Sequence, residues 1–158
     1  MDGSIADKIM QRINEASLLY YRLILIVGPA GSGKTKALQE VSFLTSTPII
    51  NVNLELSGRM LELTKAQRAL QLPYILSEFV DRVQGDLILL DNIEILFDVQ
   101  LKQDPLRLLQ GLSRNKTIVA SWNGYIEDDH IVYAVPEHPE YRRYKISDFL
   151  VVSPNIKI

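Results

Sequence analysis

The stretch LILIVGPAGSGKT occupies residues 23–35 and opens with five consecutive apolar residues. A continuous apolar run that stops at a glycine is typical of a buried strand in a parallel sheet. Residues 28–35 match the pattern GxxxxGK[ST] at every fixed position. The pattern also lies where its chemistry requires, between that strand and a helix expected from about Lys34 to Leu44. The sequence therefore predicts a phosphate-binding loop.

Each residue type in this loop suits the binding of a phosphate group for a physical reason. Glycines let backbone N–H groups curl around a β-phosphate, and the following helix points its positive end at the phosphates. We expect Lys34 to reach the β- and γ-phosphates and Thr35 to offer its hydroxyl to Mg²⁺. The alternative is a glycine-rich turn that binds nothing. The predicted nucleotide-binding residues are Gly28, Pro29, Ala30, Gly31, Ser32, Gly33, Lys34, Thr35 and Lys36.

The composition excludes several classes of protein. A length of 158 residues suits one domain. With 17 basic and 19 acidic residues the net charge is −2, which argues against a broad basic face for nucleic acid but not against a local patch. Because cysteine is absent, a disulfide scaffold, a cysteine-based zinc site and a thiol nucleophile are excluded. The N-terminal region lacks the features of a signal peptide, and a cytoplasmic setting is expected.

Strands and helices are expected to alternate along the chain. The apolar pattern predicts an N-terminal helix over 4–20 and strands over 23–27, 49–54, 87–90, 117–122 and 146–152. It also predicts a helix over 57–84 interrupted at Pro73, helices over 93–114 with a break at 104–105, and loop over 123–144 with a short strand at 131–135. This order indicates an α/β fold of the P-loop type, a three-layer α/β/α sandwich with a mainly parallel five-stranded sheet. One domain is expected over 1–158, with the N-terminal helix in 1–21 and the α/β core in 22–152.

An aspartate, Asp91, closes the expected strand 87–90. In P-loop ATPases an aspartate at the end of this strand orders the Mg²⁺ water shell opposite the loop hydroxyl, here that of Thr35. Additional-strand ATPases usually place a catalytic glutamate next, whereas this chain has Asn92, which cannot act as a base. Two interpretations stay open. Either Glu94 turns back toward the γ-phosphate, or hydrolysis is slow and nucleotide binding is the main output.

Polar residues also end the expected strand 117–122. In ATPases of this type the strand between the phosphate loop and the acidic strand ends in a residue that senses the γ-phosphate or holds the attacking water. Asn123 is the first candidate and Ser121 the second, although Asn123 with the following glycine is also an ordinary turn dipeptide. Asn51 or Asn53, on the expected second strand, could hold the catalytic carboxylate in an inactive position, since a buried asparagine needs a partner.

Two adjacent arginines, Arg142 and Arg143, lie in the segment between the last two expected strands. In ring-forming ATPases an arginine here can enter the neighbouring subunit's site and stabilise charge on the γ-phosphate. Both are candidate arginine fingers, with Arg107 and Arg114 as further candidates. The alternative is that they are solvated and pack against nearby tyrosines. Tyrosines interleaved with arginines could also stack on nucleic acid, although neighbouring acidic residues weaken that interpretation.

The order of phosphate loop, Asp91, Asn123 and late arginines resembles the additional-strand class of P-loop ATPases, and within it the AAA+ group. The short chain, GPAGSGKT at 28–35, LLDNIEILF at 89–97 and PEHPEYRRY at 136–144 together resemble the BrxF family, small P-loop proteins of type III bacteriophage-exclusion (BREX) gene clusters. The resemblance implies a bacterial cytoplasmic ATPase that binds ATP or ADP and Mg²⁺. It also implies a homo-oligomer with shared ATP sites, other BREX components as partners, and DNA contact, direct or through those partners.

Carried over by position, the resemblance implies P-loop roles for Lys34, Thr35, Asp91 and Asn123, while Asn92 departs from the AAA+ pattern. Because the expected five-stranded core uses the chain up near Val152, we expect an AAA+-like core without a C-terminal helical lid. Closure is then expected from a neighbouring subunit, a partner or the helix over 4–20. Two other functions stay open. One is a small-molecule kinase, against which the lack of a dense arginine cluster outside 142–143 argues. The other is a nucleotide-binding scaffold that hydrolyses little, as Asn92 suggests.

Overall fold

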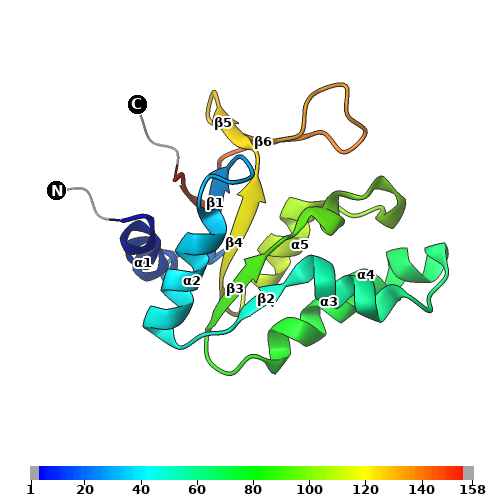
Figure 1. The fold of residues 1–158 in the computed structure, drawn as a ribbon, viewed down its shortest axis with the longest axis horizontal. Coiled ribbons are helices and arrows are strands. Elements are labelled where there is room, and N and C mark those ends of the chain that lie inside the picture. Colours follow the sequence, from blue (N-terminus) through cyan, green and yellow to red (C-terminus); the bar gives the residue numbers. More distant parts are fainter. Residues whose placement is uncertain (1–3, 155–158) are drawn as a thin grey trace.

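Strand β1, Leu23–Gly28, lies inside the main sheet, and all of its residues are buried. The structure is a computed structural model that describes residues 4–154; the ends of the predicted domain, residues 1–3 and 155–158, lie outside this range. β1 pairs in parallel with a strand on each side. The complete parallel sheet has the order β2-β3-β4-β1-β8 (Figure 1), with the strands β2 Ile49–Asn51, β3 Leu87–Asp91, β4 Thr117–Asn123 and β8 Leu150–Val152.

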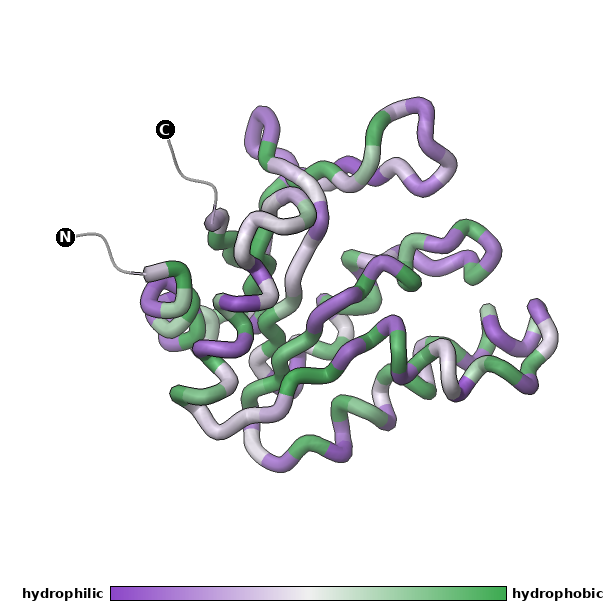
Figure 2. The backbone as a smooth tube through the Cα atoms, in the orientation of Figure 1, coloured by the Kyte–Doolittle hydropathy of each residue, from purple (hydrophilic) through white to green (hydrophobic). Residues whose placement is uncertain are grey.

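Helices cover both faces of this sheet, as the alternation of side chains along β1 requires. Ile24 and Ile26 belong to one buried cluster, which includes residues of α1 and α2. Leu23, Leu25 and Val27 belong to the other, which includes residues of α3, α4 and α5. The helices are α1 Ile5–Ala16, α2 Lys34–Thr45, α3 Val52–Met60, α4 Lys65–Arg82 and α5 Pro105–Leu112. Figure 2 shows hydrophobic colour along the central strands and polar colour in the outlying loops. The three-layer α/β/α arrangement is thus confirmed.

The second strand is shorter than predicted, because β2 ends at Asn51 and α3 begins at Val52. The Asn51 side chain accepts a hydrogen bond from the Leu54 backbone N–H at 3.1 Å, so it caps the helix. The prediction of strand over 49–54 is therefore wrong after Asn51. A capping asparagine inside an alternating apolar pattern ends the strand and starts a helix.

The predicted interruption at Pro73 is also wrong, since α4 continues through this residue and the break falls at 61–64 instead. A proline lacks the N–H that would bond to the carbonyl four residues earlier, which here belongs to Ala69. The Gln103 side chain donates to the Ala69 carbonyl at 2.8 Å. This tertiary hydrogen bond replaces the missing helical one.

The segment after β3 forms two 3-10 turns, η1 Glu94–Phe97 and η2 Val99–Leu101, before α5 begins. The break predicted at 104–105 is confirmed. Asp104 caps α5 by accepting from the Arg107 backbone N–H at 3.3 Å, and Pro105 occupies the first turn. Proline suits that position because the first N–H groups of a helix have no internal partner.

The late segment contains a second sheet that the sequence only partly predicts. It is antiparallel with the order β5-β6-β7, formed by β5 Tyr125–Glu127, β6 His130–Tyr133 and β7 Arg142–Lys145. The short strand expected at 131–135 corresponds to β6, whereas β5 and β7 fall in the predicted loop. The last parallel strand begins at Leu150 rather than at 146. Figure 1 places β5 and β6 beyond the carboxyl end of β4. Over residues 4–154, none of the helices has the length and apolar character needed to cross a membrane.

Candidate nucleotide-binding site

A cleft of about 390 Å³ lies beside the phosphate loop. Three stretches far apart in the sequence meet in it, namely the loop after β1 and the ends of β3 and β4, because β4 lies between β1 and β3 in the sheet. This meeting of strand ends is the usual place for a ligand site in an open α/β sheet. The cleft is lined by Ala30, Gly31, Gly33, Lys34, Thr35, Lys36, Asp91, Asn92, Glu94, Ser121 and Asn123.

The backbone of the loop has the conformation that its glycines predict. Gly31 and Gly33 have φ of +79° and +99°, a region that side-chain-bearing residues rarely adopt. No heavy atom lies within 4 Å of the position that a Cβ would take at either residue, so conformation rather than space requires glycine there. The helix α2 begins at the next residue, Lys34, and the N–H groups of its first turn have no carbonyl partners within the helix. The loop and this first turn form a backbone surface suited to an anion.

A polar atom in the loop lacks a partner. The Ser32 Oγ atom is buried and, within residues 4–154, has no hydrogen-bond acceptor or donor in reach. Native proteins rarely leave a buried hydroxyl unsatisfied. Together with the empty space at the two positive-φ glycines, this orphaned hydroxyl fits a loop that encloses a bound polar group such as a phosphate.

The Lys34 side chain folds back onto the start of the phosphate loop. Its ammonium donates to the carbonyl oxygens of Gly28 and Pro29, both at 2.7 Å, and the residue is buried. Burial lowers the pKa of Lys34, while the nearby carboxylates of Glu94 and Asp91 oppose that shift. The ammonium therefore lies in the loop, where it can contact phosphate oxygens.

Asp91 joins the start of α2 to the end of β4. One carboxylate oxygen accepts from the Thr35 hydroxyl at 2.8 Å, and the other accepts from the Ser121 hydroxyl at 2.6 Å. The Asn92 backbone N–H donates to the second oxygen at 3.0 Å. Ser121, the second candidate for sensing the γ-phosphate, thus contacts Asp91, a partnership that spacing along the chain does not reveal.

The Thr35 hydroxyl and the Asp91 carboxylate form a pair of hard oxygen ligands that fits Mg²⁺. This ion binds proteins through one or two carboxylates and completes its shell with water and phosphate oxygens. Across residues 4–154 there is no group of three or more histidine, cysteine, aspartate or glutamate residues able to hold a metal. Thr35 and Asp91 would leave the rest of the Mg²⁺ shell to water and phosphate oxygens.

Glu94 also enters the cleft, where it meets Asn123. The Asn123 amide donates to the Glu94 carboxylate at 2.7 Å. Burial raises the pKa of Glu94, and the neighbouring Asp91 adds to this effect, whereas Lys34 and a backbone hydrogen bond oppose it. The partner that the sequence suggested for this carboxylate, Asn51 or Asn53, is replaced by Asn123.

A left-handed residue places Glu94 in the cleft. Asn92 has φ of +54°, which asparagine tolerates better than most residues. Its carbonyl accepts from the Asn53 backbone N–H at 2.9 Å, which ties the turn to the start of α3. The chain turns directly after Asp91, and the residue two positions beyond Asn92 then faces the phosphate loop.

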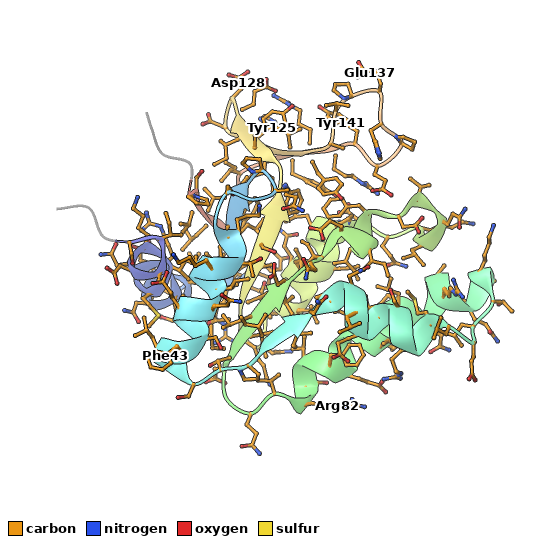
Figure 3. The ribbon with its side chains drawn as sticks, viewed as in Figure 1. Phe43, Arg82, Tyr125, Asp128, Glu137 and Tyr141 are labelled. Atoms are coloured by element: carbon orange, nitrogen blue, oxygen red, sulfur yellow. The ribbon has the colours of Figure 1, made fainter. Side chains whose placement is uncertain are left out.

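The candidate arginine fingers lie elsewhere. Neither Arg142 nor Arg143 is among the described residues that line the cleft. The half-buried Arg142 guanidinium donates to the Gln103 carbonyl at 2.8 Å, while Arg143 is exposed. Arg107 is exposed on α5, and the Arg114 guanidinium lies 4.8 Å from the centre of the Tyr20 ring. Figure 3 shows other side chains of the late segment, such as Tyr125 and Tyr141, on the small sheet and its loop.

Comparisons with known proteins give likeness of fold only. No protein-family model matches the chain, and no curated protein matches it. Similar solved structures include AMPPCP-bound DnaA from Aquifex aeolicus, with a TM-score of 0.47, 18% identity, and coverage of 77% of this chain and 40% of that one. A DNA replication initiation factor gives a TM-score of 0.46, 21% identity, and coverage of 78% and 39%. The chain thus spans about two fifths of either protein. Its own strand order and phosphate loop show the predicted P-loop α/β/α sandwich with a five-stranded parallel sheet.

Proposed function

We propose that this protein binds ATP with Mg²⁺ and hydrolyses it to ADP and phosphate, with Glu94 as the general base. The observation that carries the proposal is the meeting of three features in one cleft. These are the Lys34 ammonium in a phosphate loop, the hydrogen-bonded pair Thr35–Asp91, and the hydrogen-bonded pair Glu94–Asn123.

Each group has a role in this proposal. Backbone N–H groups of residues 28–36 bind the phosphates, and Lys34 contacts the β- and γ-phosphate oxygens. Thr35 and Asp91 would hold Mg²⁺, which, when bound, offsets the charge on the phosphate oxygens. Asn123 orients the Glu94 carboxylate through their hydrogen bond. Because Asn123 also lines the cleft, it would contact the attacking water or the γ-phosphate.

Glu94 suits the role of base because of its surroundings. A general base works best when its pKa lies near the working pH, and burial moves the pKa of Glu94 upward. Asn123 donates to one of the Glu94 carboxylate oxygens, Oε2, and the lone pairs of a carboxylate leave room to accept a proton from water. Asn92, at the position where related ATPases usually carry their base, instead forms the turn that brings Glu94 into the cleft.

The resemblance to the BrxF family supports a finer proposal. The protein would act in the bacterial cytoplasm as a nucleotide-dependent switch or motor subunit of a phage-defence complex, with other BREX components and DNA as partners. It would assemble as a homo-oligomer in which Arg142 or Arg143 enters the neighbouring subunit's cleft. Arg143 is exposed on β7 and is free of the backbone contact that engages Arg142, which favours Arg143 for this role.

Phosphate release from ATP tests the proposal directly. The purified protein with ATP and Mg²⁺ should release phosphate, at a rate per chain that rises with protein concentration if sites are shared. Lys34→Ala should abolish binding or turnover, whereas Lys65→Ala, an exposed change at the start of α4, is the matched control. ATP binding without phosphate release would favour the scaffold. A stoichiometric phosphorylated product would favour a kinase.

A further inference from the structure

Four aromatic side chains attach the small antiparallel sheet to the nucleotide-binding core. We call Phe97, Trp122, Tyr133 and Tyr144, which come from η1, β4, β6 and β7, the aromatic cluster. The rings of Phe97 and Tyr133 are stacked, with centroids 3.6 Å apart and planes 11° from parallel. Trp122 meets the edges of the other three rings at centroid distances of 5.1 to 6.2 Å. Its indole N–H also donates to the carbonyl of Val132 at 3.2 Å.

This cluster is adjacent in the chain to both partners of the Glu94–Asn123 pair. Phe97 is the last residue of η1 and Glu94 is the first, while Trp122 directly precedes Asn123. Backbone hydrogen bonds from Leu96 to Ile93 and from Asp98 to Ile95 keep η1 tightly wound. Phe97 and Glu94 are therefore the two ends of one hydrogen-bonded turn.

Tyr133, a residue of the small antiparallel sheet, stacks its ring on that of Phe97 in η1. It ends β6 and lies opposite Arg142 on β7, so it belongs to the segment that carries the two candidate arginine fingers. Its hydroxyl is near acidic groups, since burial together with the Glu140 and Glu94 carboxylates raises the pKa of Tyr133 to about 12. At neutral pH the Tyr133 phenol is therefore uncharged.

We propose that Tyr133 is a positioning residue for Glu94, because its ring holds Phe97 and thereby fixes η1 in the orientation that keeps the carboxylate beside Asn123. The small antiparallel sheet then controls hydrolysis, since any partner that displaces β6 also displaces the base. This inference rests on the proposed function. A displacement of about 1 Å in a reacting group can lower a rate by about a hundredfold, so a stack that restrains Glu94 is expected to act on kcat.

The test compares three variants by steady-state ATP hydrolysis. Tyr133→Leu removes the stack and should lower kcat at least about threefold, while the KM for ATP stays within about twofold, because the phosphate loop is untouched. Tyr133→Phe keeps the ring and should retain the wild-type kcat. Tyr144→Leu is the matched control, since it removes a ring of the same cluster that contacts Trp122 rather than Phe97. Far-UV circular dichroism shows whether each variant is folded, since the emission of Trp122 would change directly on loss of a neighbouring ring.

The outcomes separate this inference from the proposed function. Wild-type kcat in Tyr133→Leu, an equal loss in Tyr144→Leu, or a loss in Tyr133→Phe as large as that in Tyr133→Leu overturns the positioning role alone. Absence of ATP hydrolysis by the wild-type protein overturns the proposed function and this inference with it. If Tyr133→Leu fails to fold, Tyr133→Met replaces it, with the same expected split between kcat and KM.

Discussion

Gly124 links β4 to β5 and lies against the backbone of β6, so an added methyl group there should displace β6. A Cβ on Gly124 would lie 1.8 Å from the Val132 carbonyl oxygen and 3.0 Å from the Trp122 indole nitrogen. Ordinary contacts to a Cβ begin near 3.4 Å. In Gly124→Ala the backbone of β6 must therefore move by about 1.6 Å, the difference between 3.4 and 1.8 Å.

The cost of that movement has two parts. Overpacking of a well-filled site typically costs about 1–3 kcal/mol. The shift also breaks the 3.2 Å hydrogen bond from Trp122 to Val132, and an unsatisfied buried donor costs about 1–3 kcal/mol more. The free energy of unfolding should fall by roughly 2–6 kcal/mol, which for a domain of this size lowers Tm by roughly 4–24 °C.

Thermal and urea unfolding measure this change, with Gly58→Ala as the control. Gly58 lies within α3, and no atom lies within 4 Å of the position of its added Cβ. Alanine there should raise stability by about 0.5–1 kcal/mol, because glycine is a poor helix former. A Gly124→Ala variant as stable as the wild type would show that Gly124 is not in tight contact with β6 and would refute the reasoning.

Two further predictions concern single hydrogen bonds, and a third concerns the titration of Glu94. Gln103→Leu should lower the free energy of unfolding by about 1–3 kcal/mol in urea titrations, since the Ala69 carbonyl loses its donor; unchanged stability would contradict the role given to this contact. Ser121→Ala should weaken ATP binding in the presence of Mg²⁺ more than in its absence, as measured by calorimetry, because Asp91 loses a 2.6 Å hydrogen bond that orients it; an equal effect in both conditions would exclude this. The kcat for ATP should fall as pH decreases through the raised pKa of Glu94, with a midpoint above the ordinary value of 4.5, since the base must be ionised; a profile without this acidic limb would argue for another base.

The phosphate loop and the places of the parallel strands along the chain could be predicted because their signals are local. Five apolar residues before a glycine-rich run specify both the buried strand and the turn that follows it, whatever the rest of the chain does. Asp91 and Asn123 could likewise be placed at neighbouring strand ends, since parallel strands present their carboxyl ends at one edge. Their actual partners could not be predicted, because the contacts of Asp91 with Ser121 and of Asn123 with Glu94 span 30 and 29 residues.

The errors in the predicted elements have separate physical causes. Pro73 does not break α4, because the Gln103 side chain supplies the hydrogen bond that proline cannot. The second strand stops early because Asn51 caps a helix. The small antiparallel sheet is hidden in the sequence because β5 has three residues, all exposed. The turn after it has positive φ at Asp128 and Asp129 rather than at glycine.

Glu94→Gln tests the central claim most directly, with ATP binding and phosphate release measured on the same sample. The amide fills the same space but cannot accept the proton of water, and removal of a general base typically costs about 10²–10⁴-fold in rate. We predict that Glu94→Gln binds ATP and Mg²⁺ as the wild type does and releases phosphate at least about a hundredfold more slowly. Phosphate release at the wild-type rate by Glu94→Gln would contradict the account.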